Sequence, residues 1–281
     1  MTFRDRLVRP VFIVSSPRSG STLLFETLSR APDLFTIGGE SHGVIERIPA
    51  FSVPARGWQS NRLDAGDARP EPVERLAEAF YTALRDRDGS APTGAARMLE
   101  KTPKNALRVP FFDSAWPDSS FIFLYRDVRQ TIASMAEAWQ SGYFRTYPRL
   151  PGWAGPPWSL LLVPGWRELS GRPLAEIIAR QWAVTMDMLL DDLAALSEGR
   201  VEAIDYKDLL QSPQRTIDRL AAGLGIAWDT ELGGELPLSV TTVSKPAADK
   251  WRAIEGVIES IWPIVEAADA RARAFVEAHS A

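Results

Sequence analysis

The sequence contains no cysteine and only two histidines, His42 and His279. The absence of cysteine excludes disulfide bonds, catalytic thiolates and thiolate-bound metal ions. Two histidines are too few for a metal centre built on several imidazoles. We therefore expect the chain to carry out its chemistry without a resident metal ion.

Lysine is scarce as well, because the chain has 5 lysines against 27 arginines. Four of the five lysines fall in two short segments, residues 101–104 and 245–250. In a chain that otherwise uses arginine, this clustering suggests that a compact ammonium group is useful at those two places.

Long apolar runs are also missing. No stretch approaches the roughly 18 apolar residues of a membrane span, and the run Val11–Val14 is too short for the core of a signal peptide. We expect a cytoplasmic protein without a membrane span. The net charge of −4 argues against a nucleic-acid partner, so an anionic ligand would have to be met by locally gathered cations.

Short apolar runs alternate with amphipathic stretches along the chain. We expect buried strands at residues 11–14, 97–100, 121–125 and 201–204, and helices at residues 23–31, 71–87, 105–115, 127–139, 172–196, 213–224 and 250–278. This alternation predicts an α/β fold of three layers, with a central, mainly parallel sheet flanked by helices. The chain shows no repeat and no linker, so we expect one domain over residues 1–281.

Residues 140–171 have a different composition. Tryptophan, tyrosine, proline and glycine crowd together there, and no periodicity is visible. A long connection of this kind is typical of a lid or a binding loop. We therefore expect a loop insertion at about residues 140–171.

The segment after the first strand, residues 15–22, is rich in serine and contains one glycine. Helix-start N–H groups and the helix dipole favour a bound anion at such a place. Gly20 allows close approach of the backbone, and Arg18 offers a planar, bidentate cation. The hydroxyls of Ser19, Ser21 and Thr22 could add donors. The segment predicts a phosphate-binding loop, with an ordinary helix-capping turn as the alternative.

This loop differs from the Walker pattern Gly-x-x-x-x-Gly-Lys-[Ser/Thr]. No glycine precedes it, and serine follows Gly20 where the pattern requires lysine. The sequence therefore favours a phosphate ligand other than a nucleoside triphosphate.

Residues 17–24 resemble the 5′-phosphosulfate loop of the sulfotransferases, and the arginine at position 18 is similar to the tyrosylprotein and bacterial branches. Residues 121–134 resemble the 3′-phosphate site of the same family. The resemblance implies a P-loop-like fold and the donor 3′-phosphoadenosine 5′-phosphosulfate (PAPS). It assigns the donor's 5′ end to residues 18–22 and its 3′-phosphate to Arg126 and Ser134.

Three further segments agree with the family in order along the chain. Residues 100–103 resemble a segment that carries a lysine, here Lys101. Residues 204–209 are similar to a segment whose tyrosine, here Tyr206, lies near the adenine. Residues 239–251 resemble the closing segment of the tyrosylprotein branch, which implies that Ser239, Lys245 and Lys250 reach the phosphates. The insertion at 140–171 matches no branch, which leaves the acceptor open.

The resemblance also implies a base for the acceptor hydroxyl. Glu40 matches, with one inserted residue, a glutamate that is the base in the tyrosylprotein branch, and His42 is its partner or an alternative base. Arg18 would neutralise the departing phosphate, and Lys101 would steady the sulfonate oxygens. No metal ion is required by this scheme.

The acceptor is expected to be a small-molecule, lipid or carrier-bound hydroxyl compound. The aromatic insertion suggests that it is partly apolar, with the insertion as its lid. Two other functions remain open at this point: a P-loop-like small-molecule kinase, and a non-catalytic protein that binds an anion or a nucleotide. The sequence predicts no oligomeric state.

Overall fold

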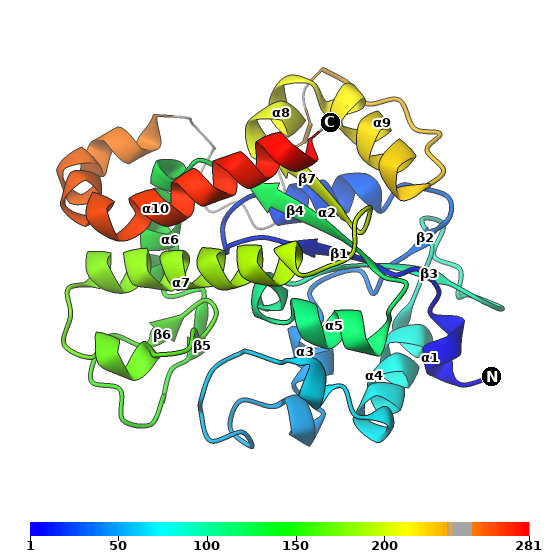
Figure 1. Cartoon of the computed structure of the whole chain (residues 1–281), viewed down its shortest axis with the longest axis horizontal. Helices are drawn as coiled ribbons and strands as arrows, with labels where there is room; N and C mark the ends of the chain where they lie inside the picture. Colours follow the sequence, from blue (N-terminus) through cyan, green and yellow to red (C-terminus); the bar gives the residue numbers. More distant parts are fainter. Residues whose placement is uncertain (235, 238–248, 281) are drawn as a thin grey trace.

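The computed structural model describes residues 1–234, 236–237 and 249–280. Its centre is a five-stranded sheet in the order β2-β3-β1-β4-β7 (Figure 1). The strands are β1 (Val11–Val14), β2 (Leu34–Phe35), β3 (Arg97–Lys101), β4 (Ser120–Tyr125) and β7 (Val201–Asp205). All neighbouring strands are parallel, which confirms the predicted sheet.

Helices cover both faces of this sheet. One face is covered by α2 (Ser21–Leu28), α8 (Tyr206–Gln211) and α9 (Pro213–Leu224), and the other by α4 (Pro70–Ala83), α5 (Val109–Ala115) and α7 (Leu174–Ala194) (Figure 1). Successive side chains of a strand point to opposite faces. In β1, Val11 and Ile13 accordingly pack under α2 and α9, while Phe12 and Val14 join the larger core on the other side. Burial on both faces explains why the strands read as wholly apolar runs.

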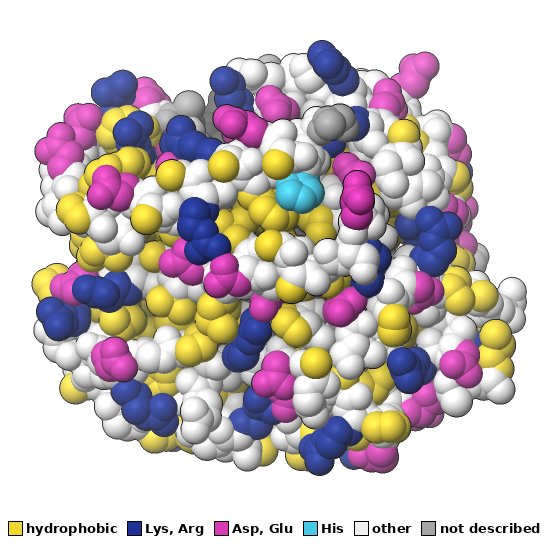
Figure 2. Space-filling view, in the orientation of Figure 1, with side chains coloured by type: hydrophobic (Ala, Val, Ile, Leu, Met, Phe, Trp, Pro, Cys, Tyr) yellow, Lys and Arg dark blue, Asp and Glu magenta, His cyan; other side chains and the backbone are white. Residues whose placement is uncertain are grey.

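The remaining elements surround this frame. They are α1 (Phe3–Arg6), α3 (His42–Ile45), α6 (Val128–Ser141), α10 (Glu255–His279), β5 (Arg145–Tyr147), β6 (Trp158–Ser159) and the 3-10 turns η1 (Pro49–Phe51), η2 (Ala65–Asp67), η3 (Pro103–Leu107), η4 (Trp166–Leu169) and η5 (Lys250–Ile254). Over the described residues, no helix is long and apolar enough to cross a membrane. On the face in Figure 2, cationic side chains are interspersed with anionic ones.

Two of the predicted helices are shortened or interrupted by tertiary contacts. The helix predicted at 71–87 ends at Ala83, because Arg85 pairs with Thr36 through two backbone hydrogen bonds of 2.8 Å. The helix predicted at 105–115 is interrupted at Arg108, which has a non-helical backbone. The Arg108 side chain is fully buried and donates to the Asn61 carbonyl at 3.1 Å. Tertiary contacts therefore decided both bounds.

The insertion is more ordered than its composition suggested. β5 and β6 form an antiparallel pair, and Trp158 and Trp166 are completely buried. Gln181 of α7 donates from Nε2 to the carbonyls of Ser159 at 3.0 Å and Leu161 at 2.6 Å. Trp158 and Trp166 thus belong to the protein core, Trp153 packs half-buried against it, and α7 holds the segment in place.

Candidate active site

A cavity of about 580 Å³ opens at the carboxyl ends of the parallel strands. Its walls come from the loop after β1, the start of α2, the segment before α3, η3, α6, the insertion and η5. β3 and β4 lie on opposite sides of β1 in the sheet. The chain segments that follow these strands therefore diverge at their carboxyl ends and leave a crevice between them. Ligands of open α/β sheets bind at such a point.

The loop after β1 has the geometry of an anion cradle. Gly20 precedes α2 with a φ of +95°, and its carbonyl accepts the first bonds of that helix from Leu23 and Leu24. Ser21 and Thr22 line the cavity. Ser19 is buried instead, and its hydroxyl hydrogen-bonds that of Ser16 at 2.7 Å. The Ser19 hydroxyl therefore already has a protein partner, and Ser19 is not among the residues that line the cavity.

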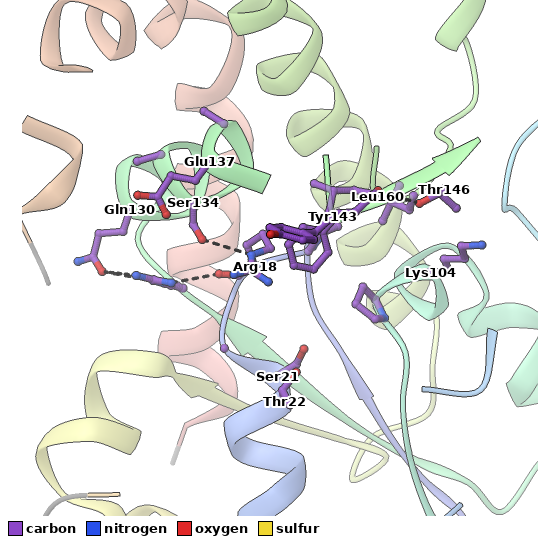
Figure 3. Close-up of a pocket in the computed structure, with 18 of the residues that line it drawn as sticks. Arg18, Ser21, Thr22, Lys104, Gln130, Ser134, Glu137, Tyr143, Thr146 and Leu160 are labelled. Carbon is purple, nitrogen blue, oxygen red and sulfur yellow. Dashed lines mark hydrogen bonds between the residues drawn. The ribbon is translucent and has the colours of Figure 1, made fainter. Parts of the chain in front are cut away.

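Arg18 lies at the centre of the cavity. Its Nε donates to the Ser134 hydroxyl at 3.3 Å, and its guanidinium lies 4.7 Å from the centre of the Phe144 ring. Figure 3 shows Gln130, Ser134 and Glu137 on one side of Arg18, and Lys104, Thr146 and Leu160 on the other. Arg18 thus stands between two halves of the same cavity.

Arg126 follows β4 and brings a second guanidinium to the same place. It donates to the Arg18 carbonyl at 3.1 Å and stacks 5.0 Å from the centre of the Tyr206 ring. Burial, together with the charge of Arg126, lowers the pKa of Arg18, and burial also lowers the pKa of Arg126. A bound anion would stabilise the charged form of both guanidinium groups, which are partly buried and close to each other. Arg126 and Tyr206 also line a second cavity of about 650 Å³.

Lys101, Glu40 and Thr22 meet beside this pair. Lys101 Nζ, almost fully buried, donates to Glu40 Oε1 at 2.8 Å and to Thr22 Oγ1 at 3.1 Å. His42 Nδ1 lies 3.5 Å from Glu40 Oε2. Burial by itself raises the pKa of Glu40, but the hydrogen bond with His42 and the Lys101 ammonium outweigh it and lower that pKa to about 2. Glu40 is therefore a carboxylate in the ligand-free protein.

Sequence reasoning missed a polar cluster in the other half of the cavity. Lys104 Nζ donates to both oxygens of Glu46 at 2.7 and 2.9 Å and to the Tyr147 hydroxyl at 3.2 Å. Arg108 also donates to Glu46, at 2.9 Å. The only sequence signal was the close pair of lysines at 101 and 104, since nothing in the sequence brings Glu46 and Tyr147 together.

The remaining predicted site residues fall into two groups. Lys250, on η5, lines the cavity and lies 3.9 Å from Glu137. Ser239 and Lys245 lie outside the described residues. Within the described part of the chain, no three His, Cys, Asp or Glu side chains come together as a metal site would require.

A model of the sulfotransferase family matches residues 10–230, which is most of the chain. The chain belongs to the sulfotransferase family. The matched range contains every described site residue except Lys250, so the family predicted from the loop and the strand-end arginine is confirmed.

A protein-tyrosine sulfotransferase and a nodulation protein are among the similar sequences. A putative protein-tyrosine sulfotransferase of Caenorhabditis briggsae is 32% identical over 127 residues, covering 45% of this chain and 42% of that protein. The nodulation protein NoeE of Sinorhizobium fredii is 25% identical over 230 residues, covering 76% and 49%. The chain thus spans about half the length of the curated relatives it matches, or less.

Solved sulfotransferase structures share the fold along nearly the whole chain. The sulfotransferase of Alicyclobacillus acidocaldarius superimposes with a TM-score of 0.52 at 18% identity, covering 96% of this chain and 97% of its own. The sulfotransferase STF9 of Mycobacterium avium gives a TM-score of 0.51 at 13% identity, covering 92% and 76%. The predicted P-loop-like α/β fold is therefore confirmed.

Proposed function

We propose that this chain is an O-sulfotransferase that moves the sulfuryl group of PAPS to a hydroxyl. The observation that carries the proposal is the position of Arg18 between the Arg126–Ser134 end of the cavity and the Lys101–Glu40 pair. PAPS carries two anionic groups, a 3′-phosphate and a 5′-phosphosulfate, and the acceptor hydroxyl needs a base beside the phosphosulfate. The cavity offers cations for both anionic groups and a carboxylate next to the second.

The donor would lie across the carboxyl ends of β1, β4 and β7. Arg126 and Ser134 bind the 3′-phosphate, and Tyr206 contacts the adenine side. The N–H groups at the start of α2, the hydroxyls of Ser21 and Thr22, and Arg18 hold the 5′-phosphosulfate. Lys250, on η5 beside α6, adds a further cation to the same cavity. We propose that Ser239 and Lys245 also contact the phosphates of the donor.

Chemistry then follows in one displacement. The acceptor oxygen attacks sulfur in line, its bond to sulfur forms, and the bond from sulfur to the phosphate oxygen breaks. The acceptor proton passes to a Glu40 oxygen, and adenosine 3′,5′-bisphosphate leaves with its new charge facing Arg18. Preorganised cations stabilise that charge without rearrangement.

Glu40 and Lys101 pair with each other in the ligand-free protein, so their two roles require an exchange of partners. The sulfonate oxygens compete with Glu40 for the Lys101 ammonium. Once Lys101 turns to the sulfonate, the pKa of Glu40 rises from about 2 and the carboxylate becomes a better base. The base would thus be activated only when the donor is bound. His42 either holds Glu40 in place or replaces it as base.

The acceptor end of the cavity would take a partly apolar hydroxyl compound, either a small molecule, a lipid or a carrier-bound chain. Phe144, Leu160 and Leu161 supply apolar wall, and Tyr143 is 86% exposed at the cavity. The buried tryptophans do not line it. The part of the insertion that acts as the lid is therefore residues 143–146 with 160–161.

The first test is thermal stabilisation by adenosine 3′,5′-bisphosphate, with adenosine 5′-monophosphate and ATP–Mg²⁺ as controls. A ligand at 100 times its Kd stabilises by about 2.7 kcal/mol. We expect a shift with the bisphosphate, followed by transfer of ³⁵S from labelled PAPS to an apolar hydroxyl probe such as 2-naphthol or to water. A shift with ATP–Mg²⁺ alone would support a kinase, and binding without ³⁵S transfer would support a non-catalytic protein.

A further inference from the structure

Glu100 is a buried acidic side chain whose presence the reaction scheme leaves unexplained. It lies on β3 beside Lys101 and is 1% exposed. Burial raises the pKa of Glu100, because a carboxylate without water is costly unless donors surround it. Such a group needs either a structural or a functional reason to be present.

Three side chains supply those donors. The hydroxyls of Ser41 and Thr102 both donate to Glu100 Oε1, at 2.5 and 2.7 Å, and Asn105 Nδ2 donates to Oε2. The Ser41 backbone N–H donates to Thr102 Oγ1 at 2.7 Å. Glu100 therefore joins the end of β3, the turn η3 and the segment that carries Glu40.

The same segment is also held by the Lys101 ammonium, which donates to Glu40 Oε1 at 2.8 Å. Gly38 and Gly39 precede Glu40, and a Cβ added to either would meet nothing within 4 Å, so the space beside these two residues is open. Ser41 stands at the N-cap of α3, where a serine hydroxyl ordinarily accepts a bond from the helix. Here it makes no such cap and donates to Glu100 instead. Glu100 thus fixes the hydroxyl of Ser41, the residue that follows Glu40 in the chain.

We propose that Glu100 is a positioning residue for sulfuryl transfer, which holds the segment of Glu40 and His42 at a set distance from Lys101. The inference rests on the proposed function, because it takes Glu40 and Lys101 as the groups that act on the acceptor and the donor. Glu100 touches neither substrate and acts through Ser41 and Thr102.

The decisive variant is Glu100→Gln, which keeps the size of the side chain. The NH₂ group of the new amide is a donor. In the place of Glu100 Oε2 it would face Asn105 Nδ2, which is also a donor, so that hydrogen bond would be lost. We expect kcat for ³⁵S transfer from PAPS, to 2-naphthol or to water, to fall about tenfold to hundredfold, as misplacement of about 1 Å does. The Kd for adenosine 3′,5′-bisphosphate should stay within about threefold, because no donor-binding group is altered.

The acid limb of kcat/KM gives a readout that simple loss of stability would not move. In the native protein the pKa of Glu40 is held near 2 by His42 and Lys101, with Arg18 also nearby. When the segment loosens, this pKa should rise toward its ordinary 4.5, and kcat/KM for PAPS, which reports the ligand-free enzyme, should begin to fall below about pH 5. The double variant Glu100→Gln/Asn105→Asp gives the new amide an acceptor and should recover most of kcat.

Two further variants serve as controls for a loss of stability and for a failure of Glu100→Gln to fold. Arg97→Met removes a buried side chain from the other end of β3, where Arg97 donates to the carbonyls of Leu224 and Gly225. It should lower stability without moving the acid limb. If Glu100→Gln does not fold, Ser41→Ala removes one arm alone and should still lower kcat about tenfold.

The outcomes separate the two proposals. Native protein that neither binds the bisphosphate nor releases it from PAPS refutes the proposed function. Active native protein with full kcat and an unmoved acid limb in Glu100→Gln, or in Ser41→Ala where the first variant does not fold, overturns the role of Glu100. Loss of kcat that the Asn105→Asp change does not recover, with an unmoved limb, overturns it as well.

Discussion

The ring of Tyr206 lies directly on Gly20, so that a Cβ added to Gly20 would stand 2.3 Å from Tyr206 Cε2. Tyr206 begins α8 after β7, and Gly20 ends the loop after β1. The contact therefore ties the proposed adenine side of the site to the proposed phosphosulfate loop. Glycine is required at this position for two reasons: the close contact with the ring, and the backbone φ of +95°.

Gly20→Ala should accordingly destabilise the protein by about 2–4 kcal/mol and abolish binding of adenosine 3′,5′-bisphosphate. Urea denaturation and titration calorimetry measure the two effects. In a Tyr206→Ala background the steric part disappears, and the cost of Gly20→Ala should fall to about 1–2 kcal/mol, the cost of the left-handed backbone alone. An equal cost in both backgrounds would show that the ring contact does not matter.

Arg126→Ala should weaken binding of adenosine 3′,5′-bisphosphate about 10-fold to 100-fold, because charge-assisted hydrogen bonds contribute about 1.5–3 kcal/mol. Binding of adenosine 5′-monophosphate, which lacks the 3′-phosphate, should hardly change. The matched control is Arg200→Ala, whose side chain donates to the Ser119 carbonyl away from the cavity. Equal losses for both nucleotides would place the 3′-phosphate elsewhere.

Glu40→Gln should lower kcat/KM by about 10²-fold to 10⁴-fold, the usual contribution of a general base. His42→Ala serves as the comparison. A loss of only a few-fold in His42→Ala would make His42 the partner of Glu40. A large loss in His42→Ala together with an active Glu40→Gln would exchange their roles.

Glu40→Gln should also change how the free energy of unfolding depends on pH in the acid range. The pKa of Glu40 is near 2 in the folded protein against an ordinary 4.5, so its ionised form stabilises the fold above pH 4.5. That contribution is lost as the pH falls from 4.5 to 2. Glu40→Gln should therefore be less stable than the native protein at neutral pH, and the difference should shrink through this window. Urea denaturation at several pH values measures it, and a constant difference would contradict the assignment.

Two substitutions separate the core part of the insertion from its cavity part. Trp158→Ala removes a fully buried ring that packs edge-on against Trp139, Trp153 and Trp166, and should cost about 3–5 kcal/mol. Tyr143→Ala removes an exposed ring and should change stability by less than about 0.5 kcal/mol. It should still raise the KM of an apolar acceptor. An unchanged KM across several acceptors would remove Tyr143 from the acceptor site.

Some of the fold could be predicted because it depends on local pattern. The runs at 11–14 and 121–125 are buried on both faces, so their apolar composition alone indicated parallel strands. The bounds of α4 and the break at Arg108 could not be predicted in this way. In each case a residue distant in sequence, Thr36 or Asn61, supplies a hydrogen bond that outweighs helix propensity.

The sequence by itself determined the family, the parallel sheet and the position of the loop between β1 and α2, because each depends on a short run of residues whose chemistry is local. Only the tertiary structure decided which groups meet. It paired Lys101 with Glu40, buried the Ser19 hydroxyl, made Trp158 and Trp166 part of the core, and placed Glu100 next to Ser41. The physical reason is that these contacts join segments from different strand ends, and their distances depend on how the whole sheet and its helices pack.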